Sequence, residues 1–250
     1  MLCFADCNQA VGMPNAASGW RAYDPEEIQK LALSCGIVHG FAYHNAALDL
    51  HPINGNAEMD LLAKRNPFFS SVWLILPNHT REFYDAEELR AKLDESGVEM
   101  VRLFPKYNSL SYSLSDWCMG EQFSMLERRK TPVLIDQAET DWEAVHALCC
   151  AHPDLPVVIT NLYYRHARNL LAIMRAHSNV YIETSGLKSF GLLQTVCETA
   201  GAKRMLFGSN LGVFSAGSAV CLVTYALISD TEKEQIAHGT LETLLERRLV

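Results

Sequence analysis

Short apolar segments alternate with longer segments of helical spacing along the whole 250-residue chain. Most of these apolar segments, such as residues 133–135 and 157–159, lack polar alternation and are typical of strands buried on both faces of a parallel sheet. Successive segments end about 25 to 35 residues apart, which is the length of one strand–helix unit. The predicted strands cover residues 2–6, 37–43, 68–76, 99–104, 132–136, 156–161, 180–184 and 204–209.

Helix-boundary signals lie between these strands. Asp24 before Pro25 is typical of a capped helix start, and Asp85 begins another helix with acidic residues in its first turn. Gly36 and Gly97 stand where helix C-caps are expected. Because eight such units use the chain, we predict a single-domain (β/α)8 barrel, a TIM barrel, over residues 1–250, with closing helices at 231–248. A doubly wound open sheet is the alternative, since a sequence does not show ring closure.

The charge balance limits the classes of partner. The chain has 29 acidic and 21 basic residues, a formal net charge of -8, and no long basic run. Nucleic-acid and membrane partners both need a basic footprint, so neither is expected. The first residues lack the basic region of a signal peptide, and no apolar stretch approaches about 18 residues. We therefore expect a cytoplasmic protein.

The cysteines are expected to be reduced core thiols. The chain has 8 of them and no C-x-x-C pair, so neither a zinc ribbon nor a thioredoxin-type motif is indicated. Free cysteine is among the most buried residue types. Those in apolar segments are Cys3, Cys149, Cys150, Cys197 and Cys221.

Polar side chains cluster at the predicted strand ends. Barrel enzymes build their sites at the carboxyl ends of the strands. This rule selects a set of acidic, amide and basic residues as candidates for a functional site. They are Asp6, Asn8, His44, Lys106, Tyr107, Asp136, Asn161, Glu183 and Asn210.

Several of these stretches carry a family resemblance. Residues 4–12, FADCNQAVG, resemble the first-strand motif Asp-x-His-x-His-x-Gly of the amidohydrolase-related metal-dependent hydrolases, amidohydrolase family 2. Residues 132–136 and 152–161 resemble the fifth and sixth strands of that family. Residues 179–186, residues 201–210 (GAKRMLFGSN) and the helix at 229–236 are similar to its seventh strand, its Gly-Ser-Asp eighth strand and its closing helix. The resemblance implies a TIM barrel and a hydrolase.

The resemblance also implies a divalent metal, but the ligand positions are substituted. Family members hold zinc or another divalent ion with histidines on strands one, five and six and an aspartate on strand eight. The matching positions here are Asn8, Ala10, Asp136, Asn161 and Asn210. Zinc prefers imidazole and thiolate ligands, so we expect no family-type metal and no cofactor. A weak site with oxygen ligands is the alternative.

Without a metal, the remaining carboxylates and Lys106 become the candidates for catalysis. Asp136 is a general acid or base candidate, with Asp6 and Lys106 as further catalytic candidates. The polar residues expected to bind a small-molecule substrate are Asn8, His44, Tyr107, Asn161, Glu183 and Asn210. The first hypothesis is a hydrolase-type enzyme with a degenerate metal site, acting on a small organic substrate. The alternatives are a non-catalytic small-molecule-binding protein or partner subunit, and an aldolase or isomerase that uses Lys106. A homodimer is the expected assembly.

Overall fold

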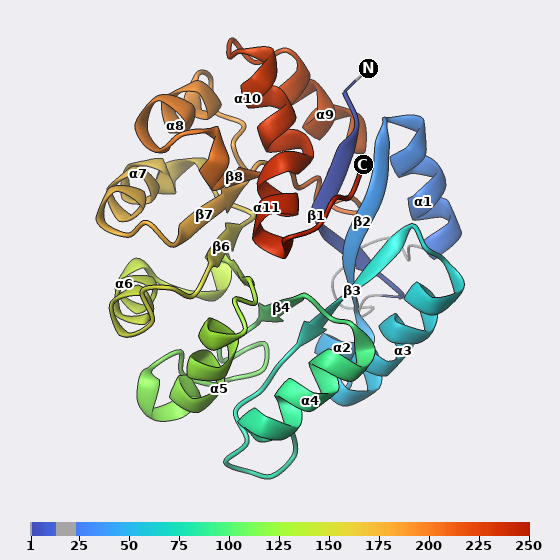
Figure 1. The fold of residues 1–250 in the computed structure, drawn as a ribbon, viewed down its shortest axis with the longest axis vertical. Coiled ribbons are helices and arrows are strands. Elements are labelled where there is room, and N and C mark those ends of the chain that lie inside the picture. Colours follow the sequence, from blue (N-terminus) through green and yellow to red (C-terminus); the bar gives the residue numbers. More distant parts are fainter. Residues whose placement is uncertain (1, 14–23) are drawn as a thin grey trace.

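The strands of the protein form one ring at its centre (Figure 1). The structure, a computed structural model, describes residues 2–13 and 24–250. Each strand pairs in parallel with the next one along the chain, in the order β1 to β8. The strands are β1 (Phe4–Val11), β2 (Ile37–His44), β3 (Phe69–Leu74), β4 (Met100–Leu103), β5 (Val133–Asp136), β6 (Val157–Thr160), β7 (Val180–Glu183) and β8 (Met205–Leu206).

The two ends of the sheet meet and close the ring. The backbone N–H of Cys7 in β1 donates to the carbonyl of Phe207, just past β8, at 3.0 Å. The N–H of Asn210 donates to the carbonyl of Asn8, also at 3.0 Å. The predicted (β/α)8 barrel is therefore confirmed, and the alternative of an open doubly wound sheet is wrong.

Helices surround the ring and cover its outer face (Figure 1). The helices are α1 (Pro25–Ser34), α2 (Ala46–Asp49), α3 (Pro52–Arg65), α4 (Ala86–Ser96), α5 (Asp116–Arg128), α6 (Trp142–Ala151), α7 (Ala167–Ala176), α8 (Leu192–Ala200), α9 (Ala216–Thr224), α10 (Asp230–Glu234) and α11 (Thr240–Leu245). The helix-boundary residues predicted from the sequence do cap their helices. Asp24 accepts hydrogen bonds from the N–H groups of Glu26 and Glu27 at the start of α1, and Gly97 ends α4 at a φ of 66°.

The C-terminal helices cover the amino end of the barrel. A π-helical turn, Gln235–Gly239, joins α10 to α11. Leu241 of α11 is buried with Ala5 and Met100, which belong to the cluster inside the ring. Arg247 forms a 2.6 Å ion pair with Glu99, immediately before β4. Since this end is closed, the carboxyl ends of the strands form the open end of the barrel.

Strand β1 continues further than the sequence predicted. It was expected to end at Asp6, but it runs to Val11 because its second half pairs with β2, with Ala10 opposite Tyr43. Asn8 and Ala10 are therefore strand residues rather than loop residues. Asn8 itself lies at an irregularity of the β1–β2 pairing, and its carbonyl accepts from the N–H of Asn210 instead.

The expectation that the cysteines are core thiols is only partly correct. Among the cysteines of the described part of the chain, Cys7, Cys149 and Cys197 are buried. Cys3, Cys150 and Cys221 are exposed, because the apolar segments that carry them lie in outer helices or at the strand entry, where one face meets solvent. Burial of a segment therefore does not decide the burial of each thiol in it.

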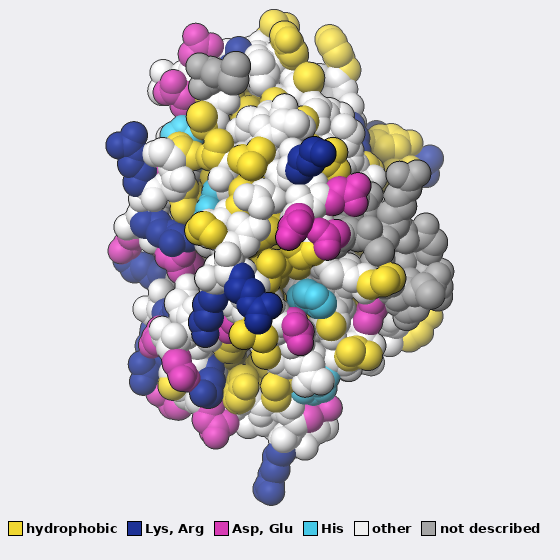
Figure 2. Space-filling model, turned by 90° about the vertical axis from the view of Figure 1, so that its right-hand side faces the viewer, with side chains coloured by type: hydrophobic (Ala, Val, Ile, Leu, Met, Phe, Trp, Pro, Cys, Tyr) yellow, Lys and Arg dark blue, Asp and Glu magenta, His cyan; other side chains and the backbone are white. Residues whose placement is uncertain are grey.

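The described surface mixes charges of both signs. On the face shown in Figure 2, basic and acidic side chains are interspersed with apolar ones. None of the helices in the described part of the chain combines the length and the apolar character needed to cross a bilayer.

Candidate functional site at the barrel mouth

A cavity of about 620 Å³ lies over the carboxyl ends of the strands. Its wall is largely aromatic and apolar, with a few polar groups, which is the usual composition of a small-molecule site. The aromatic lining residues are Tyr43, Phe104, Tyr163, Tyr164 and Phe214. The polar and charged lining residues are Asn8, Arg102, Asp136, Asn161, Lys188 and Asn210.

Asn161 is the centre of the polar cluster in this cavity. Its Oδ1 accepts hydrogen bonds from Asn8 Nδ2 at 2.9 Å and from Asn210 Nδ2 at 2.7 Å. Ser185 Oγ donates to the same oxygen at 3.2 Å. The Nδ2 of Asn161 donates to Asp136 Oδ2 at 2.6 Å. The side chains at four of the predicted positions therefore join into one network.

Two of these asparagines adopt a backbone conformation that favours their residue type. Asn161 and Asn210 have φ values of 53° and 47°, in the left-handed region. Asparagine tolerates this region better than most residues with a Cβ atom. Asn161 directly follows β6 and Asn210 lies in the segment after β8, and both amides line the cavity.

A buried arginine from β4 completes the cluster. Arg102 is 3% exposed, and its Nη1 donates to Asn8 Oδ1 at 2.7 Å. Its Nη2 donates to Thr160 Oγ1 at 3.1 Å and lies 3.7 Å from Asp136 Oδ2. The Nε of Arg102 is buried and has no partner in the described part of the chain. The guanidinium thus places a fixed positive charge inside the barrel mouth.

Two aromatic rings flank this guanidinium. The Arg102 Cζ lies 5.1 Å from the ring centre of Tyr43 and 5.2 Å from that of Phe104. Both distances are within the range of cation–π attraction. Burial raises the pKa of the Tyr43 hydroxyl, so the ring stays neutral. The rings and the amides together explain how a cation is retained at this depth.

Glu183, the last residue of β7, accepts hydrogen bonds from two residues of this network, Asn161 and Ser185. It is fully buried, and its Oε1 accepts from the Asn161 N–H at 2.6 Å and from Ser185 Oγ at 2.6 Å. Its Oε2 accepts from the Ser185 N–H at 2.7 Å. Burial raises the pKa of Glu183 to about 7, although these hydrogen bonds oppose the shift. Glu183 therefore positions the Asn161 backbone and does not line the cavity.

Asp6 has a similar structural role, because its carboxylate accepts a hydrogen bond from the backbone of Asn8. Its Oδ1 accepts from the N–H groups of Asn8 and Ser209, both at 3.0 Å, and its Oδ2 accepts from Gln9 Nε2 at 2.9 Å and from the Ser209 hydroxyl. Asp6 is fully buried, and this burial raises its pKa. It joins β1 to the segment that follows β8.

The donor set at the mouth does not fit the imidazole-rich metal site that the resemblance implies. Asn8 Oδ1 and Asn161 Oδ1 already accept hydrogen bonds, and the Arg102 cation lies beside Asp136. No histidine lines the described part of the cavity. A divalent ion would have to displace these donors and sit next to a guanidinium.

Besides Asp6 and Glu183, three further predicted site residues lie outside the cavity wall. Lys106 Nζ donates to the carbonyl of Ala138 at 3.1 Å, and Tyr107 is 83% exposed. His44 Nδ1 accepts from the N–H of Ala46 at 3.2 Å, and partial burial lowers the pKa of its ring. None of these three side chains lines the cavity.

Two functional candidates were not among the predicted residues. Arg102 had a signal in the sequence, because it is the one charge in the apolar stretch from 100 to 104. Lys188 had none, since it lies in a loop beyond β7. In the structure its ammonium lies over the ring of Phe214, 2.8 Å from the ring centre.

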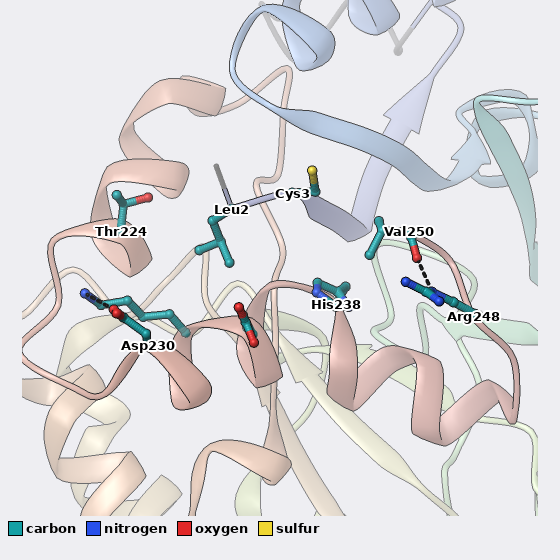
Figure 3. A pocket seen from close by; sticks show the side chains of 9 residues that line it. Leu2, Cys3, Thr224, Asp230, His238, Arg248 and Val250 are labelled. Atoms are coloured by element: carbon teal, nitrogen blue, oxygen red, sulfur yellow. Dashed lines mark hydrogen bonds and ion pairs between the residues drawn. The ribbon is translucent and has the colours of Figure 1, made fainter.

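A second hollow, of about 600 Å³, lies at the opposite, amino end of the barrel (Figure 3). Arg248 Nε donates to the Val250 carbonyl there at 2.6 Å, and Lys233 Nζ lies 3.6 Å from Asp230 Oδ1. The Asp230 side chain is 98% exposed, so this pair is solvated and weak. The barrel mouth is therefore the stronger candidate for a site.

Comparison with solved structures supports the class of fold. An uncharacterized TIM-barrel protein from Bordetella bronchiseptica is 18% identical with a TM-score of 0.73, covering 97% of this chain and 98% of that one. A 2,6-dihydroxybenzoate decarboxylase, complexed with 2,6-dihydroxybenzoate, is 14% identical with a TM-score of 0.78, covering 98% and 100%. A dihydroxybenzoic acid decarboxylase from Polaromonas with bound manganese and an inhibitor is 13% identical with a TM-score of 0.72, covering 98% and 97%. At identities this low, these structural similarities establish the TIM-barrel fold and nothing about function.

The family follows from the sequence comparison. Residues 57–245 match the family model described as Amidohydrolase (Amidohydro_2). The protein therefore belongs to this amidohydrolase family, as the strand motifs indicated. No curated protein matches the sequence.

Proposed function

We propose that this amidohydrolase-family barrel binds a small organic monoanion with an apolar or aromatic body, without a divalent metal at the barrel mouth. The observation that carries the proposal is the buried Arg102 guanidinium, which lines the cavity among the asparagines. It supplies in this barrel the positive charge that a metal would otherwise provide. The chemical class of the ligand and the loss of the metal are both part of this proposal.

The charges of the wall favour a ligand with one negative charge. Arg102 and Lys188 contribute two positive charges and Asp136 one negative charge, so the described lining residues sum to +1. A buried positive site is complementary to an anion and disfavours a cation. The Nε–H of Arg102 is buried without a partner in the described part of the chain, so the other donors of this guanidinium alone offset its burial.

The shape and lining of the cavity favour a planar apolar body. Tyr163, Tyr164 and Phe214 present rings to the cavity, and Lys188 lies against Phe214. Two of the similar barrels are named for dihydroxybenzoic acids, which are planar aromatic monoanions at neutral pH. We therefore propose an aromatic or similarly flat carboxylate as the class of ligand.

A comparison of carboxylates with their amides tests this proposal. We expect benzoate-type acids to bind the wild-type protein and the matching neutral amides to bind much more weakly, as measured by calorimetry in the presence of EDTA. Lys188→Gln should raise the Kd of the acid by about fivefold, because an ion pair at an exposed rim contributes about 1 kcal/mol. The Kd of the amide should not change.

The control variant for this test is Lys203→Gln, which removes an exposed lysine that does not line the cavity. It should leave the Kd of the acid unchanged. Equal binding of acid and amide, or equal effects of both lysine variants, would count against the proposal.

A second candidate function is catalysis by Asp136 on the bound molecule. The specific observation that favours it is that the Asp136 carboxylate lines the cavity with its side chain 18% exposed. Its Oδ1 accepts from the N–H of Ala138 and its Oδ2 from Asn161, so the protein already engages both oxygens. Ligand turnover that is lost in Asp136→Asn while binding persists would establish this second function.

A further inference from the structure

Three metal-ligating side chains gather on the outer helices, outside the cavity. His146 and Cys150 lie one turn apart on α6, and His177 directly follows α7. His146 Nδ1 lies 2.7 Å from His177 Nε2 and 4.0 Å from Cys150 Sγ, and all three ligand atoms lie within 4.8 Å of one another. We propose that His146, Cys150 and His177 form a binding site for a zinc-like divalent metal ion.

The distances are close to those of a tetrahedral site. Zinc bonds of about 2.0 Å to nitrogen and about 2.3 Å to sulfur place two nitrogen ligands about 3.3 Å apart and nitrogen and sulfur about 3.6 Å apart. To reach these values, the two imidazoles must separate by about 0.6 Å and the thiol must approach His146 by about 0.4 Å. The Cys150–His177 separation, which lies within 4.8 Å, must also come to about 3.6 Å. Changes of this size need only small rotations of exposed side chains.

The protonation states suit a metal. Two imidazole nitrogens 2.7 Å apart share a hydrogen bond, so at least one ring is neutral. A divalent ion would take the place of the shared proton and bind Cys150 as a thiolate.

The backbone around the three ligands is well held. The i and i+4 spacing places His146 and Cys150 on the same face of α6. Arg204 fixes the end of α7, because its Nη2 donates to the His177 carbonyl at 2.6 Å and its Nη1 to the Met174 carbonyl at 2.6 Å. Ligands on rigid elements lose little entropy on binding metal.

The ligand types select the class of metal. Two imidazoles and a thiolate suit zinc and similar ions, whereas Mg²⁺ and Ca²⁺ prefer oxygen. Three protein ligands leave the fourth tetrahedral position to water or an exogenous group. The site is separate from the cavity, so it stands independently of the proposed function.

Metal titration of the purified, reduced, EDTA-treated protein tests the site. We expect wild-type protein to bind one Zn²⁺ per chain, and Co²⁺ in its place to give the absorption band of cobalt–thiolate charge transfer. Cys150→Ser should abolish the band and weaken Zn²⁺ binding at least tenfold. Cys221→Ser is the matched control, since Cys221 is also exposed, and it should behave as wild type.

A second variant tests whether Zn²⁺ binding needs the histidine ligands as well as the Cys150 thiol. His177→Ala should weaken Zn²⁺ binding as Cys150→Ser does, because it removes a ligand from the other helix. The proposal is overturned if the wild-type protein shows no cobalt–thiolate band. It is equally overturned if Cys150→Ser keeps that band or if His177→Ala binds Zn²⁺ as tightly as wild type.

Discussion

Replacing Arg102 with methionine is expected to lower the free energy of unfolding by about 3 kcal/mol. Methionine keeps much of the volume of the side chain but removes the donors to Asn8 Oδ1 and Thr160 Oγ1 and the charge beside Asp136. Removing one partner of a buried charged pair leaves the other uncompensated, and this is the costly change. Urea unfolding of both proteins at neutral pH measures the difference.

A double-mutant comparison identifies the cause of this loss. In the Arg102→Met, Asp136→Asn protein, a neutral amide replaces the uncompensated carboxylate, so part of the lost stability should return. Arg102→Lys should lie between wild type and Arg102→Met, because an ammonium keeps the charge but does not reproduce the planar fork of donors. An Arg102→Met protein as stable as wild type would show that the guanidinium does not hold the barrel mouth together.

The second large effect is a pH dependence of stability that originates in Glu183. Its pKa is raised from 4.5 to about 7 in the folded protein. A carboxyl with a raised folded pKa binds its proton more tightly in the native state, so its contribution is fully present below about pH 4.5 and is lost as the pH rises through about 7. We expect this one group to make the protein about 2 to 3 kcal/mol less stable at pH 8 than at pH 5.

Comparison with Glu183→Gln isolates this contribution from the other titrating groups. Glutamine does not titrate, so the difference in unfolding free energy between wild type and variant should shift by about 2 to 3 kcal/mol in favour of wild type between pH 8 and pH 5. The cost of the altered hydrogen bonds to Asn161 and Ser185 adds the same amount to this difference at every pH, so it does not affect how the difference changes with pH. A difference that stays flat over this range would contradict the raised pKa of Glu183.

The fold could be predicted from the sequence because the strands are nearly continuous apolar runs separated by capped helices. Segments such as 133–135 and 157–159 have no exposed face, so a parallel sheet covered on both sides was the consistent solution. Ring closure could not be predicted, because it depends on hydrogen bonds between Cys7 and Phe207, at opposite ends of the chain. No local pattern encodes this pairing.

The candidate site could be predicted only where strand ends determine position. Asn8, Asp136, Asn161 and Asn210 were predicted from their strands and do meet in one network. Lys106 follows its strand by the same rule, but the loop after β4 directs its ammonium to the carbonyl of Ala138. The direction of a loop side chain depends on tertiary contacts that spacing does not reveal.

Arg102 shows the opposite limitation. Its position inside an apolar strand predicts an expensive buried charge, but its partners come from three other strands. The partners became evident only once the closed ring brought residues of β1, β5 and β6 to the same barrel mouth. A lone charge within a barrel strand is therefore a useful signal for a site.

Anomalous diffraction from crystals soaked in Zn²⁺ tests the central claim most directly, because it locates each bound ion. The account predicts no anomalous peak among Asn8, Asp136, Asn161 and Asn210, with the Arg102 guanidinium present beside Asp136. A peak at His146, Cys150 and His177 would agree with the outer site and leave this claim intact. A fully occupied zinc ion at the barrel mouth would contradict the claim that this barrel binds its ligand without a metal.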